Sequence, residues 1–277
     1  LFYAAAPLPS NVWDRLKTLS KVQRGYEVPF VSSWGSTETS PTVTTVHFPN
    51  NECNNIGLPI PGTEIKMVPF GEKWELRIRG SNVTPGYWRQ PDQTRDAFDE
   101  EGFYKIGDAG KWIDDSKPEK GIRFDGRIAE DFKLSTGTWV AASVIRLRLF
   151  AALEPLAQDV VITGHARDYI GALVFVNPNG CKQIASGMLT SEDNFADYFQ
   201  EECIRTFVRD RLLAFEREAS GTSKCVRRVI LMDRPPSPDA NEITDKGYVN
   251  QRAVLECRKE LVEKLYSEPP DTEVIVI

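Results

Sequence analysis

A short stretch in which apolar and charged residues alternate limits most strongly what this chain can fold into. Residues 73–79 read Lys-Trp-Glu-Leu-Arg-Ile-Arg, the pattern of a strand with one wet and one buried face. The segment 64–68 precedes it across a turn at 69–71, so we expect an antiparallel hairpin. Repeated glycines then predict short strands over 57–126, in a small barrel or sandwich: Gly80, Gly86, Gly102, Gly107 and Gly110.

The segments on either side of this β-rich region read differently. A helix is predicted over 10–24, capped by Ser10 with Trp13, Leu16 and Leu19 on one side, and ended by Gly25; a strand at 28–33 follows. After Arg127, helices are predicted near 140–153, 193–217 and 249–266, strands at 160–163, 170–176 and 226–232, and loops at 180–190 and 234–241. We therefore predict a mixed α+β chain with domains at 1–127 and 128–277.

Composition narrows the class of protein. The 277 residues are 41% hydrophobic with a net charge of −6, as in soluble globular proteins, and show no basic face for nucleic acid. No apolar run approaches the roughly 20 residues that span a bilayer. The five cysteines form no CxxC pair and only two histidines occur, His47 and His165. Structural disulfides, a zinc site and a Ser-His-Asp triad are disfavoured, and a reducing compartment such as the cytoplasm is expected.

The first residues, Leu1 to Pro7, contain an alanine run and no methionine. The run is too short for a signal peptide and no basic segment precedes it. The pattern is that of the second part of a strand, so we expect the chain to be part of a longer protein.

The segment 32–41, Ser-Ser-Trp-Gly-Ser-Thr-Glu-Thr-Ser-Pro, places six hydroxyl side chains and one carboxylate around one glycine, directly behind an apolar run. Such residues gather in ordinary turns, and they also suit a site that grips a phosphate and its metal ion. Three more patches follow it along the chain: Gly86-Tyr87-Trp88, Tyr104-Lys105-Ile106-Gly107-Asp108 and Gly126-Arg127. Each patch alone is weak, and their order and spacing carry the signal.

In that order the patches, with Lys246 near the end, resemble the adenylate-forming superfamily of acyl-CoA ligases, adenylation domains and luciferases. The matching motifs read WGSTE, WELRIRG with GYW, YKIGD, GR, and the lysine in NEITDKG. The wording GRIAEDFKLSTGTWV and NEITDKGYVNQRAVL looks most like feruloyl-CoA synthetases. The resemblance implies that 1–127 is the remainder of a large adenylation domain with a β-rich subdomain. Residues 128–277 would then be a small mobile C-terminal α+β domain.

The resemblance also implies a role for each matching residue. Trp34 would stack on adenine or serve as core, Thr37 would donate to a phosphate oxygen, and Glu38 would be catalytic and ligate Mg²⁺. Asp108 and Arg127 would hold the ribose. Lys246 would be the catalytic lysine. The alternative is an ordinary solvated surface lysine, which is the commoner case. The remaining ATP, AMP and coenzyme A contacts are implied for Gly35, Ser36, Ala5, Ala6 and Gly137, although plain packing explains the alanines almost as well.

The chain also departs from the family pattern. The hinge position after Gly-Arg is open among Ala129, Glu130 and Asp131, and Arg252 stands further from the lysine than usual. The family's upstream phosphate loop is not in these residues, and Ser220–Lys224 reads as a surface loop. We therefore expect a C-terminal fragment that is inactive alone.

The function implied is ATP-dependent carboxylate–CoA ligation, through an acyl-adenylate, on an aromatic acid such as the hydroxycinnamate ferulate of phenylpropanoid chemistry. The alternatives are an acyl-AMP ligase that serves a carrier, and a non-catalytic nucleotide-binding module. The expected partners are the acid, ATP and CoA, with no nucleic acid and no membrane span, and a homo-oligomer is possible.

Overall fold

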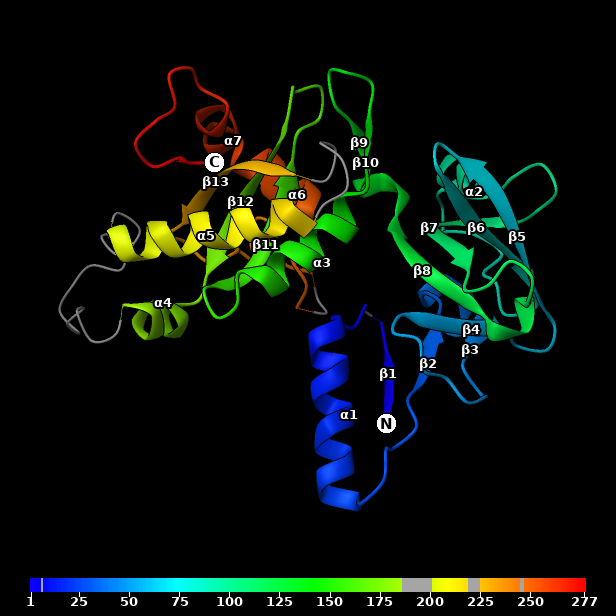
Figure 1. Ribbon diagram of the computed structural model, residues 1–277. Helices are drawn as coiled ribbons and strands as arrows, with labels where there is room; N and C mark the ends of the chain where they lie inside the picture. The colour runs from blue at the N-terminus through cyan, green and yellow to red at the C-terminus, as the bar shows by residue number, and fades with distance from the viewer. Residues whose placement is uncertain (6, 186–200, 219–224, 245–246) are drawn as a thin grey trace. The chain divides into compact units, whose positions relative to one another are not determined.

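The structure is a computed structural model that describes residues 1–5, 7–185, 201–218, 225–244 and 247–277 (Figure 1). The chain divides into two compact units, unit 1 at Leu1–Ala129 and unit 2 at Glu130–Ile277. Both helices and strands occur in each unit, so the fold is of the mixed α/β type.

Unit 1 is built on one sheet with the strand order β1-β2-β3-β4-β8-β7-β6-β5, and helix α1 follows the edge strand β1 (Figure 1). Strands β1 and β2 run parallel and the other neighbours run antiparallel. The elements are β1 Phe2–Ala4, α1 Ser10–Arg24, β2 Val31–Trp34, the 3-10 turn η1 Thr37–Thr39, β3 Thr44–Thr45, β4 Asn55–Pro59, β5 Thr63–Phe70, β6 Lys73–Gly80, α2 Pro91–Ala97, β7 Tyr104–Trp112, η2 Pro118–Lys120 and β8 Ile122–Arg127.

The predicted hairpin of unit 1 is present, with β5 and β6 paired antiparallel. Its turn is Gly71 and Glu72 rather than the predicted 69–71, because Pro69 and Phe70 still pair with Trp74 and Lys73. The prediction that Gly107 and Gly110 separate strands is wrong, since both lie within β7. A Cβ on Gly110 would come within 2.8 Å of an Ile122 side-chain carbon, so close packing explains this glycine better than a turn does.

Helix α1 has the predicted bounds and ends at Gly25, whose φ of 77° closes it in the left-handed conformation. Its N-cap residue is Pro9, so the prediction that Ser10 is the cap is wrong. Trp13 is buried, whereas Leu19 is 55% exposed and does not join the buried side. The strand predicted at 28–33 begins later, as β2.

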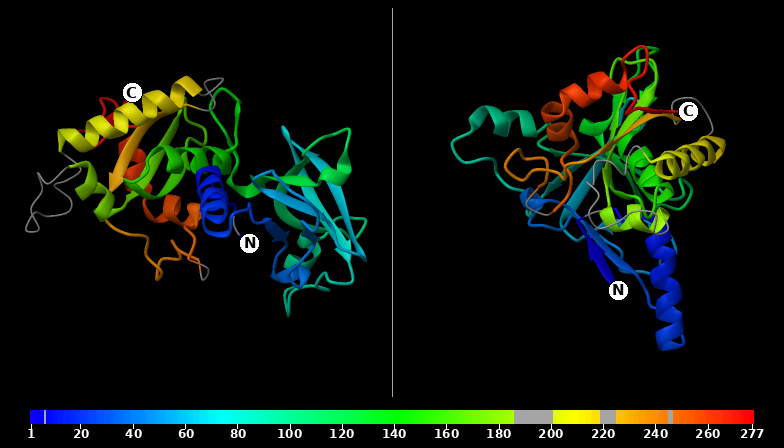
Figure 2. Two further views of the ribbon diagram at one scale, coloured as in Figure 1. Left: turned by 60° about the horizontal axis from the view of Figure 1, so that its bottom comes forward. Right: turned by 90° about the vertical axis from the view of Figure 1, so that its left-hand side faces the viewer.

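Unit 2 is a sheet with the order β11-β12-β13-β14 between two helical layers (Figures 1 and 2). Consecutive strand residues face opposite layers: Val174 packs with α3 and α5, and Phe175 packs with α6 and α7. The elements are η3 Ile128–Glu130, β9 Phe132–Lys133, β10 Trp139–Val140, α3 Ala142–Ala152, β11 Ala157–Thr163, β12 Ile170–Val176, α4 Pro178–Ile184, α5 Glu202–Glu218, β13 Val226–Met232, α6 Gln251–Cys257, α7 Lys259–Leu265 and β14 Ile275–Val276.

The three predicted strands of unit 2 are present, but two other predictions are wrong. The helix predicted at 249–266 is two helices, interrupted at Arg258, whose backbone leaves helical geometry. The loop predicted at 180–190 is helical as far as Ile184, because Pro178 begins α4 and the Asn177 side chain caps it. Residues 193–200 of another predicted helix and the predicted loop 220–224 lie outside the described residues. No described helix is long and apolar enough to cross a membrane.

Candidate adenylate site

The polar segment after β2 forms a tight turn. A Cβ on Gly35 would lie 2.0 Å from the Pro41 carbonyl oxygen, so only glycine allows the chain to pass there. Thr39 accepts a hydrogen bond from the Ser36 backbone N–H at 2.8 Å. The Asn82 side chain donates to the carbonyls of Thr39 and Thr42, at 3.0 and 2.9 Å. The loop after β6 therefore fixes the turn that carries Thr37 and Glu38.

We expect the change Gly35→Ala to destabilise the protein by about 1–3 kcal/mol, because the added methyl group meets backbone atoms that cannot rotate away. Chemical denaturation followed by circular dichroism would measure the free energy of unfolding. An unchanged value would contradict the close approach of Gly35 and Pro41.

Glu38 is held by two tyrosines. The Tyr87 hydroxyl donates to Glu38 Oε1 at 3.0 Å and lies 3.3 Å from the Tyr104 hydroxyl. Burial alone would raise the pKa of Glu38, but hydrogen bonds from its own backbone N–H and from Ser36, Tyr87 and Tyr104 together lower it. Glu38 is therefore ionised at neutral pH, as a ligand of a hard cation must be.

The change Tyr87→Phe should raise the pKa of Glu38 toward its ordinary value, because it removes a donor to the charged form. Since folding lowers this pKa, Glu38 contributes stability above its unfolded pKa and loses it as the pH falls. Tyr87→Phe should shrink that contribution. Titration of the Glu38 carboxyl carbon by NMR measures the shift, and an unchanged pKa would rule out this role of the Tyr87 hydroxyl.

Trp34, Asp108 and Arg127 meet in unit 1. The Trp34 indole N–H donates to Asp108 Oδ2 at 2.9 Å, and Arg127 Nε lies 3.4 Å from Asp108 Oδ1. Asp108 and Arg127 face each other across β7 and β8. Asp108 is buried, whereas the Arg127 side chain is 65% exposed. The indole belongs to a core cluster with Val43, Ile56, Leu76, Ile78, Tyr104 and Ile122, and its stacking on adenine stays a prediction.

Other predicted residues lie around this point. Ala4 pairs with Ser33 in parallel strands, so Ala5 and Trp34 follow at the same edge of the sheet. Thr37 is exposed on η1, where its hydroxyl is accessible. Ala6 lies outside the described residues. The first unit thus gathers Trp34 to Glu38, Asp108 and Arg127, together with Ala5.

The remaining predicted residues belong to unit 2. Gly137 lies in the turn between β9 and β10 with a φ of 81°, and Lys246 lies outside the described residues. Of the hinge candidates, Glu130 accepts a hydrogen bond from the Ser143 hydroxyl at 2.9 Å.

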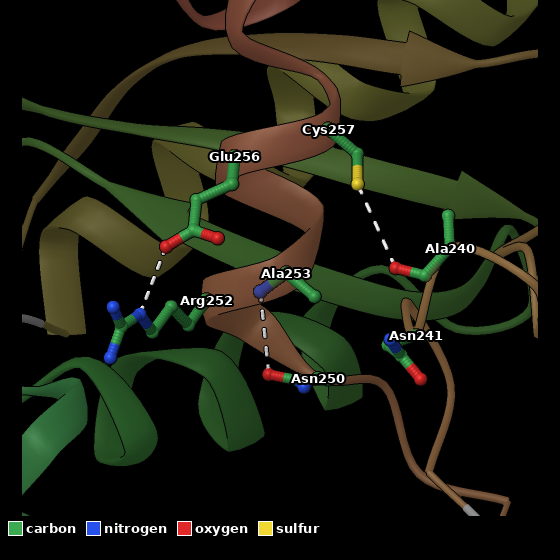
Figure 3. A pocket seen from close by; sticks show the side chains of 7 residues that line it. All are labelled: Ala240, Asn241, Asn250, Arg252, Ala253, Glu256 and Cys257. Atoms are coloured by element: carbon green, nitrogen blue, oxygen red, sulfur yellow. Dashed lines mark hydrogen bonds and ion pairs between the residues drawn. The ribbon is translucent and has the colours of Figure 1, made fainter.

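A pocket on unit 2 is lined by Ala240 and Asn241 and by residues at and after the start of α6 (Figure 3). Arg252 at its rim pairs with Glu256 one helical turn along α6, at 2.9 Å, and its side chain is 89% exposed. This contact fits the simpler interpretation of Arg252 as a helix-face charge. Across the described part of the chain, no cluster of three or more His, Cys, Asp or Glu side chains could hold a metal ion. The five cysteines are free thiols.

Sequence patterns alone did not single out three contributors to the site. Tyr87 and Tyr104 lie inside recognised motifs, yet their hydrogen bonds to the Glu38 region depend on the approach of the loop after β6 to β7. Asn82 is an isolated polar residue whose two bonds to the turn 39–42 cross about 40 residues of chain. No local pattern points to such contacts.

Known proteins resemble the chain at two levels. Residues 1–88 match the family model described as AMP-binding enzyme. A probable acyl-activating enzyme 16 of Arabidopsis thaliana, described as chloroplastic, is 28% identical over 263 residues, which cover 88% of this chain and 34% of that protein. The long-chain-fatty-acid–CoA ligase FadD15 of Mycobacterium bovis is 28% identical over 261 residues, which cover 90% of this chain and 40% of that protein.

Among solved structures, the A domain of carboxylic acid reductase from Segniliparus rugosus, in complex with AMP and a co-purified carboxylic acid, aligns with a TM-score of 0.72. The alignment covers 97% of this chain and 39% of that chain at 22% identity. The chain thus spans about a third to two-fifths of the length of these relatives. Residues 1–88 thus match the AMP-binding enzyme family, and most of the chain is similar in sequence to a probable acyl-activating enzyme and a long-chain-fatty-acid–CoA ligase.

Proposed function

We propose that the chain is the C-terminal part of an ATP-dependent carboxylate–CoA ligase. The observation that carries the proposal is the meeting of Trp34, Asp108 and Arg127, from three separate strands, with the ionised Glu38 on the turn after Trp34. Donors, acceptors and an anionic carboxylate gathered at one place suit a nucleotide and its metal ion.

The proposed reaction has two steps. The acid attacks the α-phosphate of ATP, which gives acyl-AMP and pyrophosphate; the CoA thiol then attacks the acyl carbon, which gives the thioester and AMP. Asp108 would accept hydrogen bonds from the ribose hydroxyls while Arg127 donates to them, and Ser36 and Thr37 would donate to phosphate oxygens. Each of these roles is carried over from the family.

Glu38 is the residue that would hold Mg²⁺. Its pKa is lowered, it is only partly buried, and its carboxylate is oriented by Tyr87, which fits a ligand of a hard cation. The ion would neutralise charge on the phosphates as the bond to pyrophosphate breaks. Glu38 and Thr37 together would orient the α-phosphate.

Unit 2 would serve both steps. Lys246 would stabilise the charge on the phosphoryl oxygens in the first step, and Gly137 would lie near the CoA thiol in the second. A change of orientation at residues 129–131 would replace Lys246 by Gly137 at the site between the two steps, as hinge motions rearrange sites in other enzymes.

The identity of the acid is proposed from sequence resemblance alone. The stretches 126–140 and 241–255 look most like feruloyl-CoA synthetases, which favours a hydroxycinnamate. The relatives reported above are named for other acids or for none. A panel that contains ferulate, benzoate and a long-chain fatty acid would decide between these classes.

The acceptor of the acyl group is tested by the dependence of AMP release on CoA. The full-length protein, given ATP, Mg²⁺ and each acid of the panel, should release AMP at a sustained rate only when CoA is present. Accumulation of AMP without CoA would favour an acyl-AMP ligase that serves another acceptor. No AMP with any acid would favour a non-catalytic nucleotide-binding module and contradict the proposal.

A further inference from the structure

The family pattern leaves the buried contact between Trp34 and Asp108 unexplained. The two residues lie on β2 and β7, which are not neighbours in the sheet order, and 74 positions separate them. Their hydrogen bond of 2.9 Å is buried. An adenine-stacking side chain needs a flat face and no N–H group, so stacking alone does not account for this bond.

The surroundings fix the geometry of both partners. The indole is only 8% exposed and lies within the core cluster of unit 1, which holds its ring in one orientation. Asp108 is 6% exposed and sits on β7 next to a register shift. Its Oδ2 accepts from Trp34 and its Oδ1 lies beside Arg127 Nε. The neutral Trp34 indole and the Arg127 cation thus contact different oxygens of the Asp108 carboxylate.

The hydrogen bond to Asp108 depends on which side chain stands at position 34. Phenylalanine could fill much of the same space and offer a stacking face, but it has no donor. Tyrosine has a donor at the far end of its ring rather than on its edge. Only tryptophan combines an apolar body with an N–H group at this point of the ring system.

We infer that Trp34 is a positioning residue, whose indole N–H orients the Asp108 carboxylate for the ribose hydroxyls of the nucleotide. The inference rests on the proposed function, because it assigns the ribose to Asp108. It differs from the stacking role in what it predicts. A positioning residue affects recognition of the ribose hydroxyls, whereas a stacking residue affects every adenine nucleotide alike.

The first test asks whether the bond exists in solution. The six tryptophans give indole N–H signals in a ¹⁵N–¹H spectrum, and the signal lost in Trp34→Phe identifies Trp34. In Asp108→Asn this signal should move by far more than the other five. A Trp34 signal that does not move would overturn the inference.

The second test measures affinity for AMP and for 2′-deoxy- and 3′-deoxy-AMP by calorimetry, on the full-length protein. The parent should prefer AMP to at least one deoxy analogue by about tenfold or more. Trp34→Phe and Asp108→Asn should each abolish that preference, and the double variant should be no worse than Asp108→Asn alone. Trp112→Phe, which removes an indole packed against the same core cluster, should keep it.

The outcomes separate the inference from the proposed function. If Trp34→Phe weakens AMP and both deoxy analogues equally, Trp34 acts by stacking or by packing and the inference is wrong, while the adenylate site stands. If the parent protein binds none of the three nucleotides, the proposed function is wrong and the inference falls with it.

Discussion

Replacement of Lys246 by alanine should slow acyl-adenylate formation by about a thousandfold, while thioester formation from added acyl-AMP stays near the parent rate. Attack of a carboxylate on the α-phosphate brings two anions together, and negative charge grows on the phosphoryl oxygens. One ammonium at about 4 Å contributes about 4 kcal/mol at an effective dielectric constant of 20. Before desolvation is discounted, that free energy corresponds to about a thousandfold in rate.

The measurement requires both half-reactions. Pyrophosphate release reports the first, and CoA-dependent consumption of synthetic acyl-AMP reports the second. Lys259→Ala is the matched control, since it removes an exposed lysine from the start of α7 and should change neither rate. An equal loss in both half-reactions would show that Lys246 does not have this role.

The described residues on either side of Lys246 in the sequence pair with each other. Ile243 pairs with Val249, and the Thr244 backbone N–H donates to the Tyr248 carbonyl at 2.8 Å. Glu242, directly before this pair, is 2% exposed. The flanks of the lysine segment are therefore tied to the body of unit 2.

Replacement of Arg258 by alanine should destabilise unit 2 by about 3–5 kcal/mol, because it leaves a buried carboxylate without its cation. Arg258 Nε and Nη2 donate to the two carboxylate oxygens of Glu242, each at 2.8 Å. The same guanidinium donates to the carbonyls of Arg234 and Pro235. The loop after β13 and the segment before Lys246 are thus held by one side chain, at the point where α6 ends and α7 begins.

Arg252→Ala provides the matched control on the same helical region. Its pair with Glu256 is exposed, so its loss should cost no more than about 0.5 kcal/mol. Urea unfolding of the two variants and the parent gives the comparison. Equal, small losses in both variants would contradict the buried pair.

The Arg258 variant also has a predicted pH dependence. The hydrogen-bonded pair with Arg258 lowers the pKa of Glu242 below its ordinary value. Burial acts in the opposite direction but has the smaller effect. The stability from this pair is therefore fully present above the unfolded pKa and is lost as the pH falls. The difference between the parent and Arg258→Ala should be largest near neutral pH and should shrink in acid.

Local patterns predicted about half of the strands in the described residues, because alternation and apolar runs are properties of single segments. The hairpin of β5 and β6 and the strands β12 and β13 had nearly the observed bounds. Helix α1 was also predicted, but its buried side was not, since the exposure of Leu19 depends on what the helix packs against. Arg258, at the break between α6 and α7, pairs with Glu242, 16 positions away. Tertiary contacts of this kind leave no periodic signal.

The site was predicted from motif order, and the structure adds the contacts between motifs. The approach of Asp108 to Arg127 follows from the pairing of β7 and β8, which sequence spacing could suggest. The bond from Trp34 to Asp108 crosses strands that are not neighbours and could not be read from spacing. The same is true of Tyr87 and Glu38, which come together from two loops.

A structure of the full-length protein bound to a non-hydrolysable acyl-sulfamoyl adenosine would test the adenylate site most directly. We expect the ribose hydroxyls within hydrogen-bond distance of the Asp108 carboxylate, with Arg127 beside them and the sulfamoyl group near Thr37. An adenosine bound anywhere else on the protein, with Asp108 and Arg127 free of it, would contradict the account.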